Sequence, residues 1–259
     1  MSVFDIKQWL DEKVIQYNRP EFIKNDPIQI PHNYKRKEDI EISGFLTAII
    51  SWGQRKTIIN NALKLMHLMD DMPYDFVMYS SDYELKKLKN FVHRTFQGVD
   101  CVFFIKSLKN IYLEFGSIEN VFAIEIKKGN SVKNAIERFR DVFFSLPHEK
   151  RTEKHLPNIS KGAAAKRINM FLRWMVRKDN AGVDFGIWET ISPSMLYLPL
   201  DVHSANVSRQ IGLLNRTQND WKAVEEVTAV LKKMDPEDPV KYDFALFGAG
   251  VENDFSYGN

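Results

Sequence analysis

Apolar residues recur every three or four positions along most of the chain, and runs that alternate apolar with polar residues are scarce. That spacing puts the apolar side chains on one face of an α-helix, so the pattern predicts an all-α protein. In the stretch 100–115, for example, Cys101, Phe104 and Leu108 fall on one stripe, which Gly116 ends. The ranges expected to be helical are 1–18, 39–53, 57–70, 82–88, 100–115, 131–146, 162–178, 202–211, 221–234 and 240–247.

Proline and glycine mark the ends of several of these helices, because proline lacks a backbone donor and glycine favours helix ends. The first helix stops before Pro20, and the last is expected to stop before Gly248 and Gly250. Residues 52–55, Trp-Gly-Gln-Arg, form the turn between the second and third helices. The chain shows no repeat of 20 to 50 residues, which argues against a solenoid.

Composition excludes several classes of protein. Of the 259 residues, 44% are hydrophobic and 27% are charged, which is ordinary globular usage and excludes a disordered chain. The longest nearly continuous apolar stretch, 45–52, is too short to cross a membrane. The stretch 1–13 is interrupted by acidic residues and does not have the apolar centre of a signal peptide, so we expect a cytoplasmic protein. The single cysteine, Cys101, excludes an internal disulfide and an iron-sulfur cluster.

The charges are unevenly distributed, although their sum is only +2. Residues 127–179 contain fourteen Lys and Arg against five Asp and Glu, an excess of +9, so the remainder carries about −7. Within the expected helix 162–178, Lys166, Arg173 and Arg177 occupy a face apart from the apolar residues, which predicts a basic outer surface. Such a segment is either a cationic face for a polyanion or a solvated helical surface.

A short turn, 156–162, directly precedes this basic helix. Its sequence, Leu-Pro-Asn-Ile-Ser-Lys-Gly, joins two expected helices and leaves unpaired N–H groups at the start of the second. Those donors can hold a phosphate oxygen without reading base sequence. The alternative is an ordinary connection between helices, with Ser160 as a cap.

A second segment, 200–212, begins with Leu-Asp-Val-His and leads into a helix. Asp201 at the start of that helix is either a helix cap or a reactive carboxylate. His203 either contacts DNA or packs beside Asp201. The other histidines show no spacing typical of metal ligands, so no metal or other cofactor is expected.

Taken together, a Leu-Pro turn, an amphipathic helix and an Asp-x-His leading into a Val-x-Arg helix resemble the helix-hairpin-helix DNA glycosylase superfamily, to which endonuclease III belongs. The resemblance is clearest over 156–250 and fainter over 45–66, and it points to an uncharacterised bacterial branch. It implies an all-α, two-lobed fold with a cleft between the lobes. Residues 39–193 then form a helical barrel lobe with the hairpin, and 1–38 with 194–259 form the second lobe.

The resemblance also implies site residues. Asp201 matches the catalytic aspartate, and Gln54 matches the glutamine that fills the gap left by an extruded base. The residues expected to contact double-stranded DNA are Gln54, Asn158, Ile159, Ser160, Lys161, Gly162, Lys166 and His203. The activity implied is base excision, in which the enzyme flips a damaged or mismatched base and Asp201 assists hydrolysis of its N-glycosidic bond.

The sequence departs from the superfamily in the turn. Members with lyase activity carry a lysine where Gly162 stands here, and Lys161 and Lys166 lie one residue before and four residues after that position. We therefore expect a monofunctional glycosylase, with Lys161 as a candidate second catalytic residue. Asn158 and Ser160 replace the two usual hairpin glycines. The alternatives are a DNA-binding module without chemistry and a helical interaction scaffold; the oligomeric state stays open.

Overall fold

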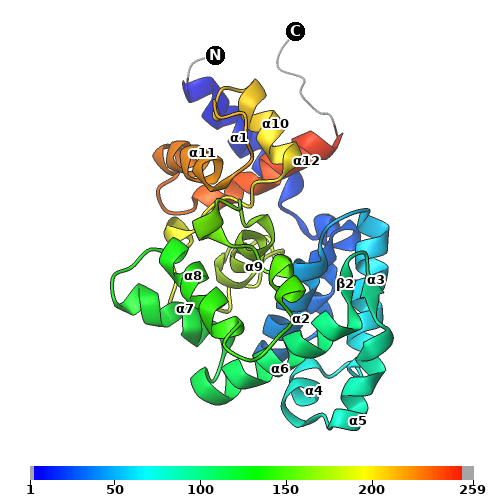
Figure 1. The fold of residues 1–259 in the computed structure, drawn as a ribbon. Helices are drawn as coiled ribbons and strands as arrows, with labels where there is room; N and C mark the ends of the chain where they lie inside the picture. The colour runs from blue at the N-terminus through cyan, green and yellow to red at the C-terminus, as the bar shows by residue number, and fades with distance from the viewer. Residues whose placement is uncertain (1–2, 253–259) are drawn as a thin grey trace. The chain divides into compact units, whose positions relative to one another are not determined.

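The computed structural model describes residues 3–252, and this part of the protein is all-α apart from one small hairpin (Figure 1). The α-helices are α1 (Val3–Tyr17), α2 (Lys37–Ile50), α3 (Arg55–Leu68), α4 (Pro73–Tyr79), α5 (Asp82–Leu85), α6 (Gly98–Phe115), α7 (Ile118–Lys127), α8 (Val132–Phe143), α9 (Lys166–Val176), α10 (Val202–Gln210), α11 (Trp221–Met234) and α12 (Tyr242–Glu252). Short 3-10 helices are η1 (Pro20–Asn25), η2 (Pro27–Gln29), η3 (Pro31–Asn33), η4 (Lys86–Asn90), η5 (Lys150–His155), η6 (Ile159–Lys161), η7 (Pro193–Met195) and η8 (Pro239–Lys241). The hairpin pairs β1 (Val92–His93) with β2 (Phe96–Gln97). Among the helices described, none is both long enough and apolar enough to cross a membrane.

Most of the expected helices are confirmed, one of them, α11, with the bounds expected for it. The first was expected to begin at residue 1, but residues 1 and 2 lie outside the described part of the chain. Two further helices and the hairpin were not expected. Helix α4 has only seven residues, too few to show a clear period of apolar positions. Helix α7 begins after Ser117, whose hydroxyl caps the helix by accepting a hydrogen bond from the Asn120 N–H.

The chain divides into two compact units. Unit 1 consists of Met1–Phe22 with Asn158–Asn259, and unit 2 is Ile23–Pro157. The sequence interpretation placed α9 in the middle lobe, 39–193. In the structure, α9 belongs to unit 1, together with the two ends of the chain. Helix α9 is held in unit 1 because two arginines, Arg173 within the helix and Arg177 at its end, pair with carboxylates in the range 184–243.

In unit 2, helix α6 packs against α4, α7, α8 and η4. A buried carboxylate, Glu41 on α2, ties three helices together. It accepts hydrogen bonds from the Tyr112 hydroxyl of α6 at 2.5 Å and from the Ile118 N–H at the start of α7 at 2.9 Å. A helix N-terminus favours a negative charge, so the start of α7 stabilises the Glu41 carboxylate.

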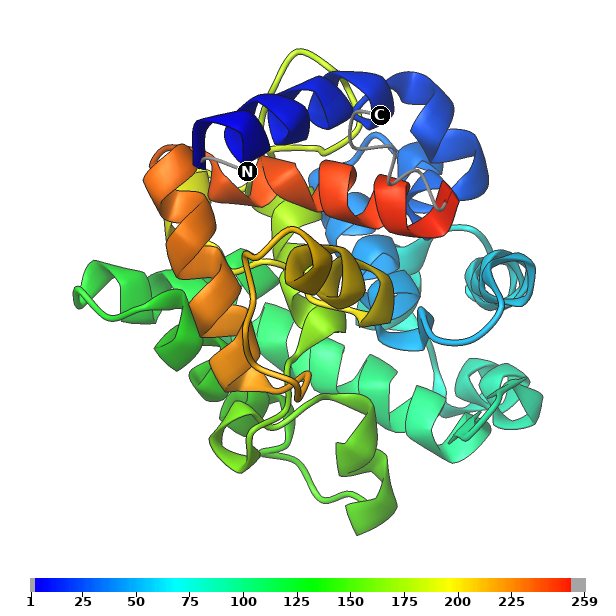
Figure 2. The ribbon, with the colours of Figure 1, turned by 90° about the horizontal axis from the view of Figure 1, so that it is seen from above.

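In unit 1, helix α12 lies between α1 and α10 and contacts both (Figure 2). Two glycines allow this close packing. A Cβ atom at Gly248 would lie 2.4 Å from Tyr17 of α1, and one at Gly250 would lie 2.9 Å from His203 of α10. The expectation that the last helix stops before these glycines is therefore wrong: α12 continues through both of them, because the neighbouring helices occupy the space that a side chain would need.

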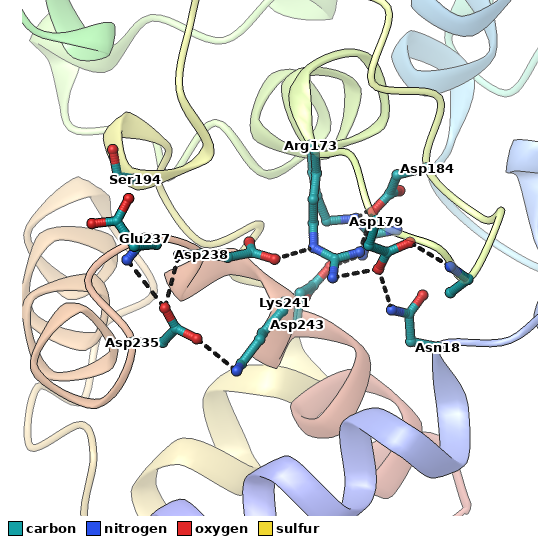
Figure 3. Close-up of polar contacts among 12 residues, drawn as sticks. Asn18, Arg173, Asp179, Asp184, Ser194, Asp235, Glu237, Asp238, Lys241 and Asp243 are labelled. Carbon is teal, nitrogen blue, oxygen red and sulfur yellow. Dashed lines mark hydrogen bonds and ion pairs between the residues drawn. The ribbon is translucent and has the colours of Figure 1, made fainter.

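A buried ionic network joins α9 to the rest of unit 1 (Figure 3). Arg173 pairs with Asp184 at 3.3 Å and with Asp243. Arg177 pairs with Asp184 at 3.1 Å and with Asp238 at 2.8 Å. The two arginines are only 4% and 2% exposed, so the expectation that they form a basic outer surface is wrong. Their partners lie outside α9, at separations of 7 to 70 residues for the pairs given above, so the helical spacing within α9 does not reveal them.

Candidate functional site

Asp201 lies at the N-terminus of α10, where its side chain caps the helix. Its carboxylate accepts a hydrogen bond from the Ser204 N–H at 2.9 Å, and the Ser204 hydroxyl accepts one from the Asp201 N–H at 2.9 Å. This reciprocal capping box fixes the carboxylate at a helix start, where a negative charge is favoured. The side chain nevertheless stays 20% exposed, so Asp201 is both a cap and an accessible carboxylate.

Lys166, the first residue of α9, brings an amine to this carboxylate. The Lys166 Nζ atom lies 3.9 Å from Asp201 Oδ2 and 3.5 Å from the Met170 sulfur. The preceding residue, Ala165, has a φ of 53°, a left-handed conformation that alanine rarely adopts. This bend starts α9 at Lys166 and puts the lysine in its first turn.

An aromatic ring from α12 lies beside this pair. The Phe247 ring centroid is 6.0 Å from Lys166 Nζ and 6.3 Å from the centroid of the His203 ring. His203 is exposed and packs against Gly250 rather than bonding to Asp201. The site thus combines a carboxylate, an amine, an imidazole and an apolar ring from three helices of unit 1, α9, α10 and α12.

A buried carboxylate on α12, Asp243, links the site to the ionic network. Burial raises its pKa to about 6, against the opposing charge of Arg173; the negative charge of Asp201 raises it further and Lys166 lowers it. Asp243 therefore senses both exposed members of the site electrostatically, and its own hydrogen-bonded partner is Arg173. Burial also raises the pKa of Asp184, the carboxyl that both arginines share.

The turn that was expected to hold a phosphate uses its donors internally. The Lys161 N–H donates to the Asn158 backbone and side-chain oxygens, and the Gly162 N–H donates to the Ile159 oxygen at 2.7 Å. The Ala163 N–H also donates to Asn158. The expectation that the second helix begins at Gly162 with free N–H groups is therefore wrong, because α9 begins four residues later.

The same turn is anchored to the start of α11. The Trp221 N–H donates to the Gly162 oxygen at 3.0 Å, and Ala163 forms a β-bridge with Asp220. Of the expected DNA-contacting residues in the turn, Ser160, Lys161 and Gly162 are exposed and Asn158 is half-buried, whereas the Ile159 side chain is buried. On the N-terminal side of the turn, the chain forms the 3-10 helix η5 instead of an α-helix.

Gln54 belongs to unit 2. It is exposed at the N-terminus of α3, and its side chain makes no capping hydrogen bond there. The turn expected between the second and third helices is confirmed, since α2 ends at Ile50 and α3 begins at Arg55.

The structure brings together Asp201, Lys166 and His203, and it adds two residues that the sequence interpretation missed, Asp243 and Phe247. A signal for Asp243 existed. It is the one charged residue in the apolar stretch 242–250, and a buried carboxylate in such a stretch is seldom without a partner. Among the described residues, no group of three or more His, Cys, Asp and Glu side chains is arranged to hold a metal ion.

Comparison with known protein families gives a match over most of the chain. A family described as a protein of unknown function, DUF2400, covers residues 26–252. The chain belongs to this family. The match contains all four residues of the unit 1 site, Lys166, Asp201, His203 and Phe247, whereas α1 lies outside it. Neither the curated proteins nor the solved structures contain a match to the chain.

Proposed function

We propose that this DUF2400 protein is a DNA base-excision glycosylase with the two-lobed helix-hairpin-helix glycosylase fold, and that it acts on damaged or mismatched bases. The observation that carries the proposal is the Asp201–Lys166 pair: a carboxylate fixed at a helix start yet accessible, with an amine 3.9 Å away. The sequence resemblance assigns the catalytic role to the same aspartate.

In the proposed reaction, Asp201 acts on the sugar of a flipped nucleotide. Cleavage of the N-glycosidic bond leaves positive charge on the sugar, and a fixed carboxylate stabilises that charge. The same carboxylate orients or deprotonates the attacking water. The capping box supports this role because it holds the carboxylate in place, so little reorganisation is needed as the charge develops.

A second candidate function is favoured by the position of Lys166. In a glycosylase that is also a lyase, a neutral amine attacks C1′ of the sugar and displaces the base. Opening of the C1′–O4′ bond then gives a Schiff base, from which the 3′ phosphate leaves by β-elimination. Lys166 is the lysine beside Asp201, although the sequence interpretation favoured Lys161 or no lysine at all. Borohydride trapping of the protein on abasic DNA tests this: the covalent complex is expected with Lys161→Gln and is expected to be lost with Lys166→Gln.

The glycosylase proposal is tested with purified protein and a panel of duplexes, each with one lesion or mismatch, scored for new abasic sites. Release of at least one base is the expected result. If the protein binds abasic-analogue DNA but releases no base from any duplex, the chain is a DNA-binding module without chemistry. If it shows no salt-dependent affinity for DNA, both accounts are rejected in favour of an interaction scaffold.

A further inference from the structure

The hairpin of unit 2 carries an arginine in an unusual backbone conformation. Strands β1 and β2 pair antiparallel, with His93 opposite Phe96, so that Arg94 and Thr95 form a two-residue turn. Arg94 has a φ of 54°, the left-handed region in which a turn of this length favours glycine or asparagine. A glycine would occupy this position without strain, so the arginine side chain needs another explanation.

The residues next to Arg94 in the hairpin are firmly held. The His93 ring is 1% exposed, and its two nitrogens lie 2.9 Å from the Asn61 side chain and 3.2 Å from the Trp52 carbonyl oxygen. Phe96 is buried against the Phe104 ring at 5.2 Å. The hairpin is thereby fixed against the turn that joins α2 to α3, which is the turn that ends in Gln54.

The guanidinium of Arg94 lies on this turn. Its carbon is 4.9 Å from the centroid of the Trp52 ring, and Nη1 lies 2.6 Å from the position of a Cβ atom built on Gly53. Arg94 is exposed, and within residues 3–252 no carboxylate forms an ion pair with it. Other arginines of unit 2, such as Arg36, Arg140 and Arg151, are paired with Asp or Glu.

We propose that Arg94 is a second DNA-contacting residue of unit 2, which binds a backbone phosphate next to the position that Gln54 occupies. A guanidinium is always charged and its planar fork matches a phosphate, so an arginine already stacked on Trp52 loses little freedom when it binds. The absence of a carboxylate partner leaves its donors available. This inference rests on the proposed function, because it assumes that the protein binds DNA.

The experiment measures the affinity of the full-length protein for a duplex with one abasic analogue, as a function of salt concentration. Arg94→Gln is compared with Arg138→Gln, which removes the same charge from an exposed site on α8. A lost phosphate contact reduces the slope of log K against log salt by about one and weakens binding about tenfold at low salt. We expect both effects for Arg94→Gln and neither for Arg138→Gln.

Two further variants separate binding from a structural role. Arg94→Gly relieves the backbone strain, so it is expected to lose the same DNA affinity while its melting temperature does not fall by more than a few degrees. Arg94→Lys keeps the charge and is expected to retain the salt slope with a smaller loss of affinity. A lowered melting temperature in Arg94→Gln and Arg94→Gly, together with an unchanged salt slope, means that Arg94 only holds Trp52, and overturns the inference.

The outcome for Arg94 is distinguishable from the outcome for the proposed function. Base release by the wild-type protein, with the same salt slope in Arg94→Gln, overturns the inference and leaves the glycosylase proposal intact. A reduced slope in Arg94→Gln without base release from any lesion supports the inference and rejects the glycosylase. A wild-type protein that does not bind the abasic-analogue duplex overturns both.

Discussion

In unit 2 the interior is built largely from rings, whereas unit 1 buries two arginines among several carboxylates. The Phe45 and Phe139 rings lie 5.5 Å apart, and the Phe104 and Phe143 rings 4.7 Å apart. In unit 1, by contrast, Arg173 and Arg177 are more than nine-tenths buried. The carboxylates around them are those of Asp179, Asp184, Asp238 and Asp243.

The two interiors differ in what fixes their geometry. Packed phenylalanine rings contribute stability that does not itself depend on pH, because a phenyl ring does not titrate. Removing ion pairs from water costs desolvation free energy, and their mutual attraction offsets this cost only when every partner is correctly placed. Buried ion pairs therefore fix the relative positions of the elements that carry them. Asp243 belongs to the ionic network of unit 1 and interacts electrostatically with Asp201 and Lys166. The candidate site is therefore next to an interior whose geometry is fixed by ion pairs.

The largest expected effect comes from Arg173→Met, which removes a buried cation and leaves Asp184 and Asp243 with one partner fewer. Breaking a buried pair in this way costs about 3–5 kcal/mol of unfolding free energy. The control is Arg138→Met on the exposed face of α8, expected to change stability by about 0.5 kcal/mol or less. Denaturant unfolding measures both, and a loss below about 1 kcal/mol in Arg173→Met contradicts the role given to the network.

The next effect is a pH dependence from Asp243. Its pKa is raised from 3.8 to about 6 in the folded protein, so the folded state binds more protons than the unfolded state between these values. This group therefore contributes stability that is present below about pH 4 and is lost as pH rises through about 6, up to about 3 kcal/mol.

Asp243→Asn removes this contribution. We expect the stability of the wild-type protein, relative to the variant, to fall by about 1–3 kcal/mol between pH 4 and pH 8, measured by denaturant unfolding. The carboxylates whose pKa is lowered, such as Asp179, are common to both proteins and cancel in the difference. A relative stability that rises over this interval contradicts the raised pKa.

The smallest effect is expected in the ring-packed interior. Phe104→Leu removes a fully buried ring edge and is expected to destabilise the protein by about 1–2 kcal/mol. Because neither phenylalanine nor leucine titrates, the loss is expected to be equal at pH 5 and pH 8. A loss that changes by more than about 1 kcal/mol between these values would show that the two interiors do not differ as described.

The sequence was sufficient where a local signal decides the structure. The period of apolar residues located α11 and α6, and glycine at the turn located the junction of α2 with α3. It failed at α12, where Gly248 and Gly250 read as a helix end. The two glycines are needed there because α1 and α10 pack closely against α12, and these contacts join segments far apart in the chain.

The candidate site was predictable in part for the same reason. Asp201 stands at a helix start that the sequence indicates, and the capping box is a local pattern. The sequence interpretation gave Lys161 the second catalytic role and Lys166 only a DNA contact, because an alanine at position 165 does not indicate the left-handed bend with which α9 begins. The burial of Arg173 and Arg177 depends on partners that lie outside α9, 2 to 70 residues away, which helical spacing within α9 cannot reveal.

The most direct test of the central claim compares Asp201→Asn with Asp220→Asn in single-turnover base release from the best substrate of the lesion panel. Both aspartates cap a helix, and asparagine caps equally well, so both variants keep the fold. If Asp201 stabilises the charge on the sugar, Asp201→Asn lowers the rate by about 10²–10⁴-fold, and Asp220→Asn leaves it within about threefold of wild type. Equal rates in the two variants contradict the catalytic role of Asp201.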